Sequence, residues 1–226
     1  MKETRSEVFC YLPCMTRALG WCGVILAAGE SSRMGSDKAL LPWPPAGSGA
    51  LPTGETFVSA AIRLLSSFAD QVVVVVGKNE SSLTPAVYAA GGSLVRNPEP
   101  ERGQFSSLQV GLREVLNQGR DASVVTLVDR PPAGPEVLEK LRQAFETSGS
   151  EVWGLVPEYK GKHGHPFLAS RELIEAFLKA PATATARDVE HENQQHIQYV
   201  PVDDPRVVMN VNTPEEYAAL LNARTA

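Results

Sequence analysis

A glycine-rich loop after an apolar run is the part of the sequence best suited to chemistry. Residues 24–28 are apolar, and the loop that follows carries two glycines, two serines and two cations: Gly29, Ser31, Ser32, Arg33, Gly35 and Lys38. Glycines let backbone N–H groups turn toward an anion, and the cations supply charge that a triphosphate needs. The spacing matches neither a Walker A loop nor G-x-G-x-x-G. The loop predicts binding of a phosphate chain; the competing interpretation is a tight turn whose cations face solvent.

Asp129 directly follows a second apolar run, residues 124–128. If this run is a parallel strand, Asp129 emerges at its carboxyl end, where open α/β sheets bind ligands. Mg²⁺ takes few protein ligands, mostly carboxylates, and completes its octahedron with phosphate oxygens and water. Asp129 therefore predicts a magnesium site, although an aspartate close to a proline is also a common turn residue.

A basic segment, residues 160–166, combines Lys160 and Lys162 with His163 and His165. Such a segment suits a zinc site, a catalytic base or a substrate-binding loop. The H-x-H spacing alone is weak evidence for a metal, because no third ligand stands at a recognised spacing. A solvated basic turn is the competing interpretation.

The elements that must position these residues alternate along the chain. Short β-branched runs predict strands at residues 22–27, 71–76, 93–95, 123–128, 152–158 and 198–202. Apolar residues at helical spacing predict helices at residues 56–68, 106–117, 135–145, 171–179 and 213–222, the last with Thr213 as its N-cap. The alternation predicts an α/β fold with helices on both faces of a mostly parallel sheet.

The same pattern predicts the organisation of the chain. The domain is expected to span residues 21–226, after an N-terminal extension formed by residues 1–20. Residues 42–54 are rich in Pro, Gly and Ser and are expected to form a mobile loop.

Composition excludes several classes of protein. The chain of 226 residues has a net charge of −5, from 21 Lys and Arg against 26 Asp and Glu, so no basic surface for nucleic acid or an anionic membrane is expected. Its longest apolar runs are far shorter than the roughly 18 to 20 residues of a membrane helix. The charged N-terminus does not have the pattern of a secretory signal, so a cytoplasmic protein is expected. Cys10, Cys14 and Cys22 are expected to be reduced and mostly inert.

The loop is the first of several motifs that occur in a known order. Leu26-Ala27-Ala28-Gly29-x-Ser31-x-Arg33-Met34-Gly35-x-x-Lys38 resembles the signature of nucleotidyltransferases that make molybdenum-cofactor dinucleotides. The motifs that follow are Asn97-Pro98, Gly103-Gln104-x-Ser106-Ser107-Leu108-x-x-Gly111-Leu112, Asp129-x-Pro131, Gly164-His165-Pro166, Ala186-Arg187 and Asn210-x-Asn212-Thr213-Pro214-Glu215-Glu216. The resemblance spans residues 23–221 and implies a three-layer, Rossmann-like nucleotidyltransferase fold.

The resemblance also implies a role for each motif. Lys38, Arg33 and Asp129 would be catalytic, with the two cations on the β- and γ-phosphates and Mg²⁺ on Asp129. One of the two asparagines, Asn210 or Asn212, would face the metal opposite Asp129. The acceptor would contact Lys160, Lys162 and His165. Nucleotide binding would involve Leu26, Ala27, Ala28, Gly29, Ser31, Ser32, Gly35, Asn97, Gln104, Ser106 and Ser107.

Three of the motifs look like the cytidylyltransferase branch of this family, which uses CTP. These are Ala27-Ala28-Gly29, the Ser-Ser-Leu segment and Gly-His-Pro, whereas the guanylyltransferase branch usually has a second glycine before Gly29. Asn210-Val211-Asn212 departs from the Asp-x-Asp common in the CTP branch and looks more like the GTP branch. CTP is therefore the expected nucleotide, and GTP is its competitor.

The implied reaction moves CMP from CTP to the terminal phosphate of molybdenum-bound molybdopterin and releases pyrophosphate, for maturation of molybdenum hydroxylases. An apo-molybdoenzyme or its chaperone would then be a partner. The enzyme alternatives are a guanylyltransferase and a transferase for a sugar or polyol phosphate. A noncatalytic cofactor carrier and a nucleotide sensor are the alternatives from other classes. Two features favour the carrier: the two asparagines, and Arg130 at a position where the family usually has an uncharged residue.

Overall fold

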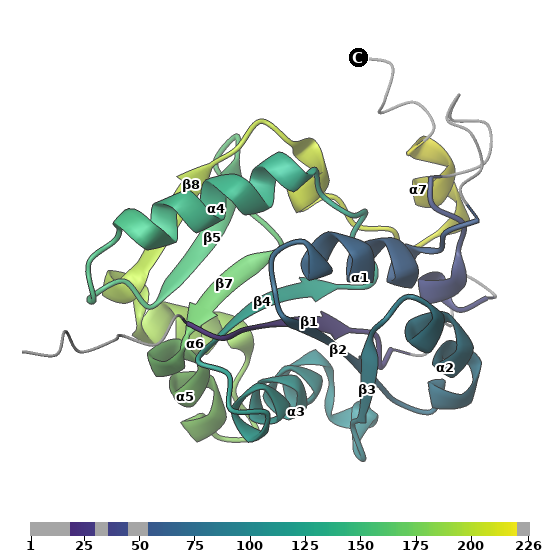
Figure 1. Ribbon diagram of the computed structural model, residues 1–226, viewed down its shortest axis with the longest axis horizontal. Coiled ribbons are helices and arrows are strands. Elements are labelled where there is room, and N and C mark those ends of the chain that lie inside the picture. Colours follow the sequence, from purple (N-terminus) through teal and green to yellow (C-terminus); the bar gives the residue numbers. More distant parts are fainter. Residues whose placement is uncertain (1–18, 30–35, 45–53, 221–226) are drawn as a thin grey trace, which may run out of the picture.

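The fold is built on one eight-stranded sheet, whose strands are drawn as arrows in Figure 1. The computed structural model describes residues 19–29, 36–44 and 54–220. The strands follow the order β3-β2-β1-β4-β7-β5-β6, and β8 pairs with β5. Their bounds are β1 Trp21–Leu26, β2 Gln71–Val76, β3 Ser93–Arg96, β4 Ala122–Leu127, β5 Gly154–Tyr159, β6 Lys162–His163, β7 Phe167–Ser170 and β8 Ile197–Pro201.

The sheet is mostly parallel and changes direction at β7. The pairs β1–β2, β1–β4, β2–β3 and β5–β8 are parallel, whereas β7 runs antiparallel to both β4 and β5. From β1 the chain continues to β2 and β3 on one side, while β4 lies on the other side of β1. The strand order therefore reverses between β1 and β4, where open α/β sheets form a crevice beyond their carboxyl ends.

Helices cover both faces of the sheet, so the fold has three layers (Figure 1). Helices α1, α2 and α4 pack on one face, and α3, α5 and α6 pack on the other. Shorter helical turns and α7 complete the chain. The bounds are α1 Phe57–Ser66, α2 Glu80–Ala89, α3 Gln104–Asn117, α4 Pro135–Thr147, α5 Arg171–Lys179, α6 Ala186–Glu192 and α7 Pro214–Ala219, with short 3-10 helices η1 Lys38–Leu40, η2 Pro100–Arg102, η3 Gln194–His196 and η4 Pro205–Val208.

The alternation of side chains in β1 explains why it needs cover on both faces. Cys22 and Val24 point into the core under α3, whereas Ile25 points into the core under α1. Helix α3 approaches the sheet closely at Gly111, where a Cβ atom would lie only 2.6 Å from Cγ1 of Val24. A larger residue at position 111 would force the helix and the sheet apart.

The predicted fold class is confirmed, and the predicted strands and helices appear within a few residues of their expected bounds. Thr213 caps α7 as predicted, because its side chain accepts a hydrogen bond from the backbone N–H of Glu216. Among the described residues, two strands and two α-helices were not predicted, β6, β7, α2 and α6, and neither were the short 3-10 helices η1 to η4. Helix α2 has a weak pattern because only Leu83 and Val87 are buried and Pro85 lies inside it.

Parts of the remaining predictions fall outside the described residues. These include nearly all of the 1–20 extension, with Cys10 and Cys14, and positions 45–53 of the expected mobile loop. Cys22 is buried in β1, and burial raises the pKa of its thiol to about 12, which keeps it protonated and unreactive. Among the described helices, none is both long enough and apolar enough to cross a membrane.

Candidate active site

A cleft opens at the carboxyl ends of β1 and β4, at the point where the strand order reverses. Its volume is about 290 Å³. The loop after β1, the turn after β4 and the start of α3 all contribute to it. The lining residues are Leu26, Ala28, Gly29, Lys38, Pro100, Gly103, Gln104, Ser107, Leu127, Val128 and Asp129. The structure thus brings Lys38 and Asp129, which are far apart in the sequence, to the same cleft.

Lys38 is hydrogen-bonded to Asn212, and its neighbour Asp37 is fixed by further hydrogen bonds. Its Nζ atom donates to Oδ1 of Asn212 at 2.8 Å, so the ammonium group is fixed against the segment that precedes α7. Asp37 caps the short helix η1, accepting the N–H of Ala39 with Oδ1. The Oδ2 atom of Asp37 accepts a hydrogen bond from Nδ2 of Asn79 at 2.7 Å.

Asn79 joins this loop to the ends of two strands. Its Nδ2 atom also donates to the carbonyl of Ala27 at 2.9 Å, and its Oδ1 atom accepts the N–H of Gly77 at 3.1 Å. The amide of Asn79 therefore uses both of its N–H donors and one lone pair of its oxygen to connect η1 with β1 and β2. Asn79 was not predicted as a site residue, and its sequence context, Gly77-Lys78-Asn79, gives only a turn signal.

Asp129 lies beside the segment that carries Asn210 and Asn212. Its backbone carbonyl accepts the N–H of Val211 at 2.8 Å, which places the 210–212 segment along the turn after β4. Its Oδ1 atom is buried and has no hydrogen-bond partner among the described residues. A buried carboxylate oxygen without a donor is costly unless a cation meets it.

The residues present fit a divalent cation that relies on its substrate. Asp129 supplies one carboxylate, an oxygen donor that suits Mg²⁺. Asn210 and Asn212 lie on the neighbouring segment, and Oδ1 of Asn212 accepts a hydrogen bond from Nζ of Lys38. Across the described residues, no group of three or more His, Cys, Asp or Glu side chains could hold a metal. Such a site would leave most of the coordination to phosphate oxygens and water, as in many sites that bind a metal–nucleotide complex.

Arg130 points away from the cleft. Its Nη1 atom donates to the carbonyls of Val207 and Met209, each at 3.3 Å, on the segment that leads to Asn210. Burial lowers the pKa of its guanidinium, and the nearby Asp129 partly offsets that effect. The unusual arginine thus cross-links the turn after β4 to the C-terminal segment and does not line the cleft.

The start of α3 forms the opposite wall. Gly103 precedes the helix with a φ of +94°, a conformation that other residues adopt only with strain. Asn97 is buried and donates to the hydroxyls of Ser106 and Ser107, each at 2.9 Å. Ser107 and Gln104 line the cleft, whereas Asn97 and Ser106 do not line it and support this wall from behind.

A second, larger cavity adjoins the cleft. Its volume is about 610 Å³, and it shares Leu26, Gly103, Gln104 and Leu127 with the cleft. Its walls come mainly from α3, β4, β7 and the segment that enters α6. The other lining residues are Arg102, Phe105, Leu108, Val125, His165, Phe167, Ala182, Thr183, Ala184, Thr185, Ala186 and Glu190.

His165 lines this cavity and is uncharged there. Burial lowers the pKa of its imidazole to about 3, and the positive charge of Arg130 adds to that effect. Its Nδ1 atom is buried without a hydrogen-bond partner among the described residues, and its ring packs edge-on against Phe167. A neutral imidazole can still donate or accept a hydrogen bond from a ligand.

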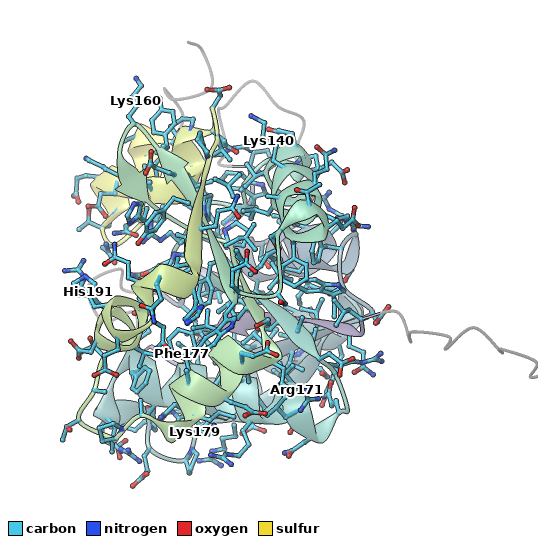
Figure 2. All side chains as sticks on the ribbon, turned by 90° about the vertical axis from the view of Figure 1, so that its left-hand side faces the viewer. Lys140, Lys160, Arg171, Phe177, Lys179 and His191 are labelled. Carbon is cyan, nitrogen blue, oxygen red and sulfur yellow. The ribbon has the colours of Figure 1, made fainter. Side chains whose placement is uncertain are left out.

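The structure does not bring Lys160 and Lys162 to either cavity. Both are exposed on the β5–β6 hairpin, and Lys160 extends from the edge of the molecule in Figure 2. His163 on the same hairpin stacks on Tyr199 at a centroid distance of 3.7 Å. Two exposed lysines on a short turn gave the sequence pattern its basic character, although only His165 points inward.

The remaining predicted residues fall into two groups. Leu26, Ala28 and Gly29 line the cleft, and Ala27 holds Asn79 through its carbonyl. The others lie outside the described residues: Ser31, Ser32, Arg33 and Gly35. Two residues near the cavities, Asn79 and Glu190, carried no motif that could have revealed them, because each is brought to the site by the tertiary fold.

Comparison with known proteins gives the family. Residues 23–198 match the MobA-like NTP transferase domain. The chain belongs to this family. It is a nucleotidyltransferase, and the cleft at the β1–β4 switch point is its candidate active site.

Relatives in the family carry different names. The chain is 35% identical over 219 residues to the purine catabolism protein PucB of Bacillus subtilis, covering 86% of this chain and 93% of PucB. It is 26% identical over 213 residues to a probable molybdenum cofactor guanylyltransferase of Mycobacterium avium, covering 93% and 100%. It is 22% identical over 196 residues to the molybdenum cofactor cytidylyltransferase of Escherichia coli, covering 86% and 92%.

Solved structures share the fold over most of the chain. Rv0371c from Mycobacterium tuberculosis has a TM-score of 0.71 and 26% identity, covering 91% of this chain and 98% of its own. A complex of Rv0371c with manganese has a TM-score of 0.69 and 23% identity, with coverage of 90% and 99%.

Proposed function

We propose that this nucleotidyltransferase moves CMP from CTP to the terminal phosphate of molybdenum-bound molybdopterin. The observation that carries the proposal is the pairing of two cavities. A polar cleft with Lys38 and Asp129 opens into a mainly apolar cavity with His165. The cleft suits a triphosphate, and the cavity suits a second, less polar substrate whose phosphate meets the nucleotide where the two join.

The reaction needs alignment more than acid–base chemistry. A phosphomonoester oxygen of the acceptor is already anionic at neutral pH. It attacks the α-phosphorus of CTP, a new O–P bond forms, and the bond to the β-phosphate oxygen breaks, so that pyrophosphate leaves. No proton has to be removed from the nucleophile, and catalysis rests on positioning and on neutralising charge.

Lys38 and Arg33 are assigned to the negative charge of the β- and γ-phosphates. The hydrogen bond that Lys38 donates to Asn212 fixes the ammonium group, and the bonds that Asp37 accepts from Ala39 and Asn79 fix the backbone next to it. A preorganised cation loses little energy to rearrangement when the pyrophosphate charge develops. The start of α3, at Gly103 and Gln104, adds the positive end of a helix dipole to the same cleft.

Asp129, with Asn210 or Asn212, is assigned to hold a divalent cation, of which Mg²⁺ is the one proposed. The orphaned Oδ1 atom of Asp129 supports this assignment. The bound cation would neutralise charge on the triphosphate and on the leaving pyrophosphate. Because the asparagines bring no charge, we expect the cation to bind weakly without nucleotide and tightly with it.

The choice of CTP rests on the three motifs that look like the cytidylyltransferase branch, Ala27-Ala28-Gly29, Ser106-Ser107-Leu108 and Gly164-His165-Pro166, of which the first brings Ala28 to the cleft. This residue contributes a methyl group to the cleft wall, where the guanylyltransferase branch is expected to have glycine. The named guanylyltransferase relatives make GTP the competing nucleotide.

Pyrophosphate release tests the proposal directly. The purified protein is incubated with Mg²⁺ and each of CTP, GTP, ATP and UTP, with and without molybdopterin carrying molybdenum. We expect release with CTP only when the pterin acceptor is present. Turnover with GTP and with no other nucleotide would replace CTP as the proposed substrate. Turnover with a sugar or polyol phosphate but not with the pterin would overturn the proposed identity of the acceptor.

The same assay separates an enzyme from a cofactor carrier. A carrier would activate an apo-molybdoenzyme, or act through its chaperone, without releasing pyrophosphate. Measuring both activation and pyrophosphate in one reaction therefore distinguishes the two. Activation with no pyrophosphate from any nucleotide would favour the carrier.

A further inference from the structure

The cavity beside the cleft contains a carboxylate that the proposed reaction does not use. Most of its walls are apolar, with Phe105, Leu108, Leu127 and Phe167 among them. Glu190 is the one acidic side chain that lines it, as far as the structure describes the chain. A carboxylate in an apolar wall is costly unless a donor meets it.

The protein fixes Glu190 at this position. Helix α6 begins with a capping box between Thr185 and Asp188, and Val189 anchors the helix in the core. Burial raises the pKa of the Glu190 carboxyl, while His163, Arg187 and His191 lower it by smaller amounts. Within the described residues, no hydrogen bond or ion pair to the carboxylate of Glu190 is found.

A second polar group in the cavity is also unsatisfied. The Nδ1 atom of His165 is buried without a partner among the described residues, and the imidazole is neutral. Arg102, Gln104, Thr183 and Thr185 also line the cavity, and the guanidinium of Arg102 pairs with Glu99. Glu190 therefore supplies the anionic acceptor of this lining, and His165 supplies a neutral donor or acceptor.

We propose that Glu190 determines acceptor specificity by accepting hydrogen bonds from adjacent N–H groups on the edge of a planar heterocycle. Two neighbouring N–H donors, as in an aminopyrimidinone ring, match the two oxygens of a carboxylate. Phe105 and Phe167 offer apolar surface to the faces of such a ring. This inference rests on the proposed function, because it names the group that reads the pterin of the acceptor.

The test compares Glu190→Gln with Glu192→Gln. Glu192 lies on the same helix but is exposed and does not line the cavity, so it is a matched control. Gln keeps the size of Glu and replaces the carboxylate by an amide. We expect Glu190→Gln to raise the KM for molybdopterin on the order of 10-fold to 100-fold, while the KM for CTP changes less than about twofold. The control variant should match the wild type in both constants.

Competing ligands add a second readout. In the wild type, 6-hydroxymethylpterin should inhibit competitively against the acceptor. The corresponding lumazine, which has a carbonyl in place of the amino group, should inhibit at least about fivefold more weakly. Glu190→Gln should lose this discrimination. Absence of inhibition by either compound, or equal inhibition by both, would contradict the assignment.

The outcomes separate this inference from the proposed function. If the wild type releases no pyrophosphate with any nucleotide and molybdopterin, the proposed function fails. If the wild type is active and Glu190→Gln has an unchanged acceptor KM, only the role of Glu190 fails. A rise in the CTP KM instead would place the nucleotide base in the cavity and overturn the acceptor assignment. Thermal unfolding of both variants checks that each is folded.

Discussion

The cleft and the cavity that meet at β1 and β4 are built in different ways. The cleft is about half polar and takes most of its polar residues from segments just beyond strand ends, such as Lys38 and Asp129. The cavity is mainly apolar and combines α3, the antiparallel strand β7 and the entry to α6. Under the proposed assignment, phosphate chemistry depends on local turns, whereas acceptor recognition depends on distant segments that pack together.

This contrast also separates two kinds of unsatisfied group. In the cleft, the buried Oδ1 atom of Asp129 has no hydrogen-bond donor among the described residues, and a bound cation would compensate its charge. In the cavity, Glu190 and His165 have polar atoms that the hydrogen-bonding groups of an organic ligand would satisfy. Variants in the cleft should therefore affect every reaction of the nucleotide, and variants in the cavity should affect only the acceptor.

The largest effect is expected from Asp129→Ala. Loss of the carboxylate removes the charged ligand of the proposed metal site, so kcat/KM should fall on the order of 10³-fold or more. The concentration of Mg²⁺ needed for half-maximal activity should rise. Steady-state pyrophosphate release across a Mg²⁺ titration measures both quantities.

Asp203→Ala is the control for this variant, because Asp203 is also an aspartate but is exposed near η4. It should behave as the wild type. Retention of most activity by Asp129→Ala would show that the cleft does not need this carboxylate and would break the comparison between the two sites.

The next largest effect is expected from Lys38→Met. Removing the ammonium group should lower kcat/KM for the nucleotide by about 10²-fold to 10³-fold, the scale of one preorganised electrostatic group. Binding of the acceptor, measured as competitive inhibition by pterin, should change little. The control is Lys179→Met on α5, where the lysine is exposed and pairs with Glu175. A loss confined to acceptor binding would show that Lys38 acts on the acceptor and not on the nucleotide.

Much of the cleft could be predicted because its residues stand in local motifs. An apolar run followed by Gly29 and Lys38, or by Asp129, identifies both a strand and the position of its carboxyl end. The resemblance then ordered these motifs along the chain. The strands could be predicted for the same reason, because a buried parallel strand is a continuous β-branched run.

The cavity could be predicted only in part. His165 stood in a motif, but β7, which follows it, is four residues long and shows no alternation. Glu190 lies in a polar run that predicts a solvated surface, and the register of the short helix α6 decides that it faces inward while Glu192 faces outward. Lys160 and Lys162 show the reverse case, since their charge suggested a phosphate site and their hairpin places them outside.

A smaller effect is expected from Asn79→Asp, which tests whether the support of Lys38 matters. The new carboxylate would face Asp37, whose Oδ2 atom now lies 2.7 Å from Nδ2 of Asn79. Repulsion should displace η1 and lower kcat/KM for the nucleotide by about 10-fold, with little change in acceptor binding. Steady-state kinetics with each substrate varied in turn measures the split.

A double variant and a control complete this experiment. Adding Asp37→Asn should restore part of the activity, because an amide at position 37 can donate to the carboxylate at position 79. Asn117→Asp is the matched control, since Asn117 also donates to a carboxylate, Glu114, but on the exposed side of α3. If the double variant is no better than the single one, Asn79 does not act through Asp37.

The smallest effect is expected in the stability of Glu190→Gln. Because burial raises the pKa of Glu190 above its ordinary value of 4.5, the folded protein holds this proton more tightly than the unfolded chain. Its contribution to stability is therefore present below that pH and is lost as pH rises through the folded pKa. At pH 7 the variant should be more stable than the wild type, by less than about 1 kcal/mol. The gain should vanish near pH 4 in urea unfolding, while Glu192→Gln shows no gain. If Glu190→Gln gains stability at pH 7 but loses affinity for the acceptor, the carboxylate is kept for recognition. If the variant loses stability instead, Glu190 has a structural role, and the cavity no longer differs from the cleft in holding a group for the acceptor.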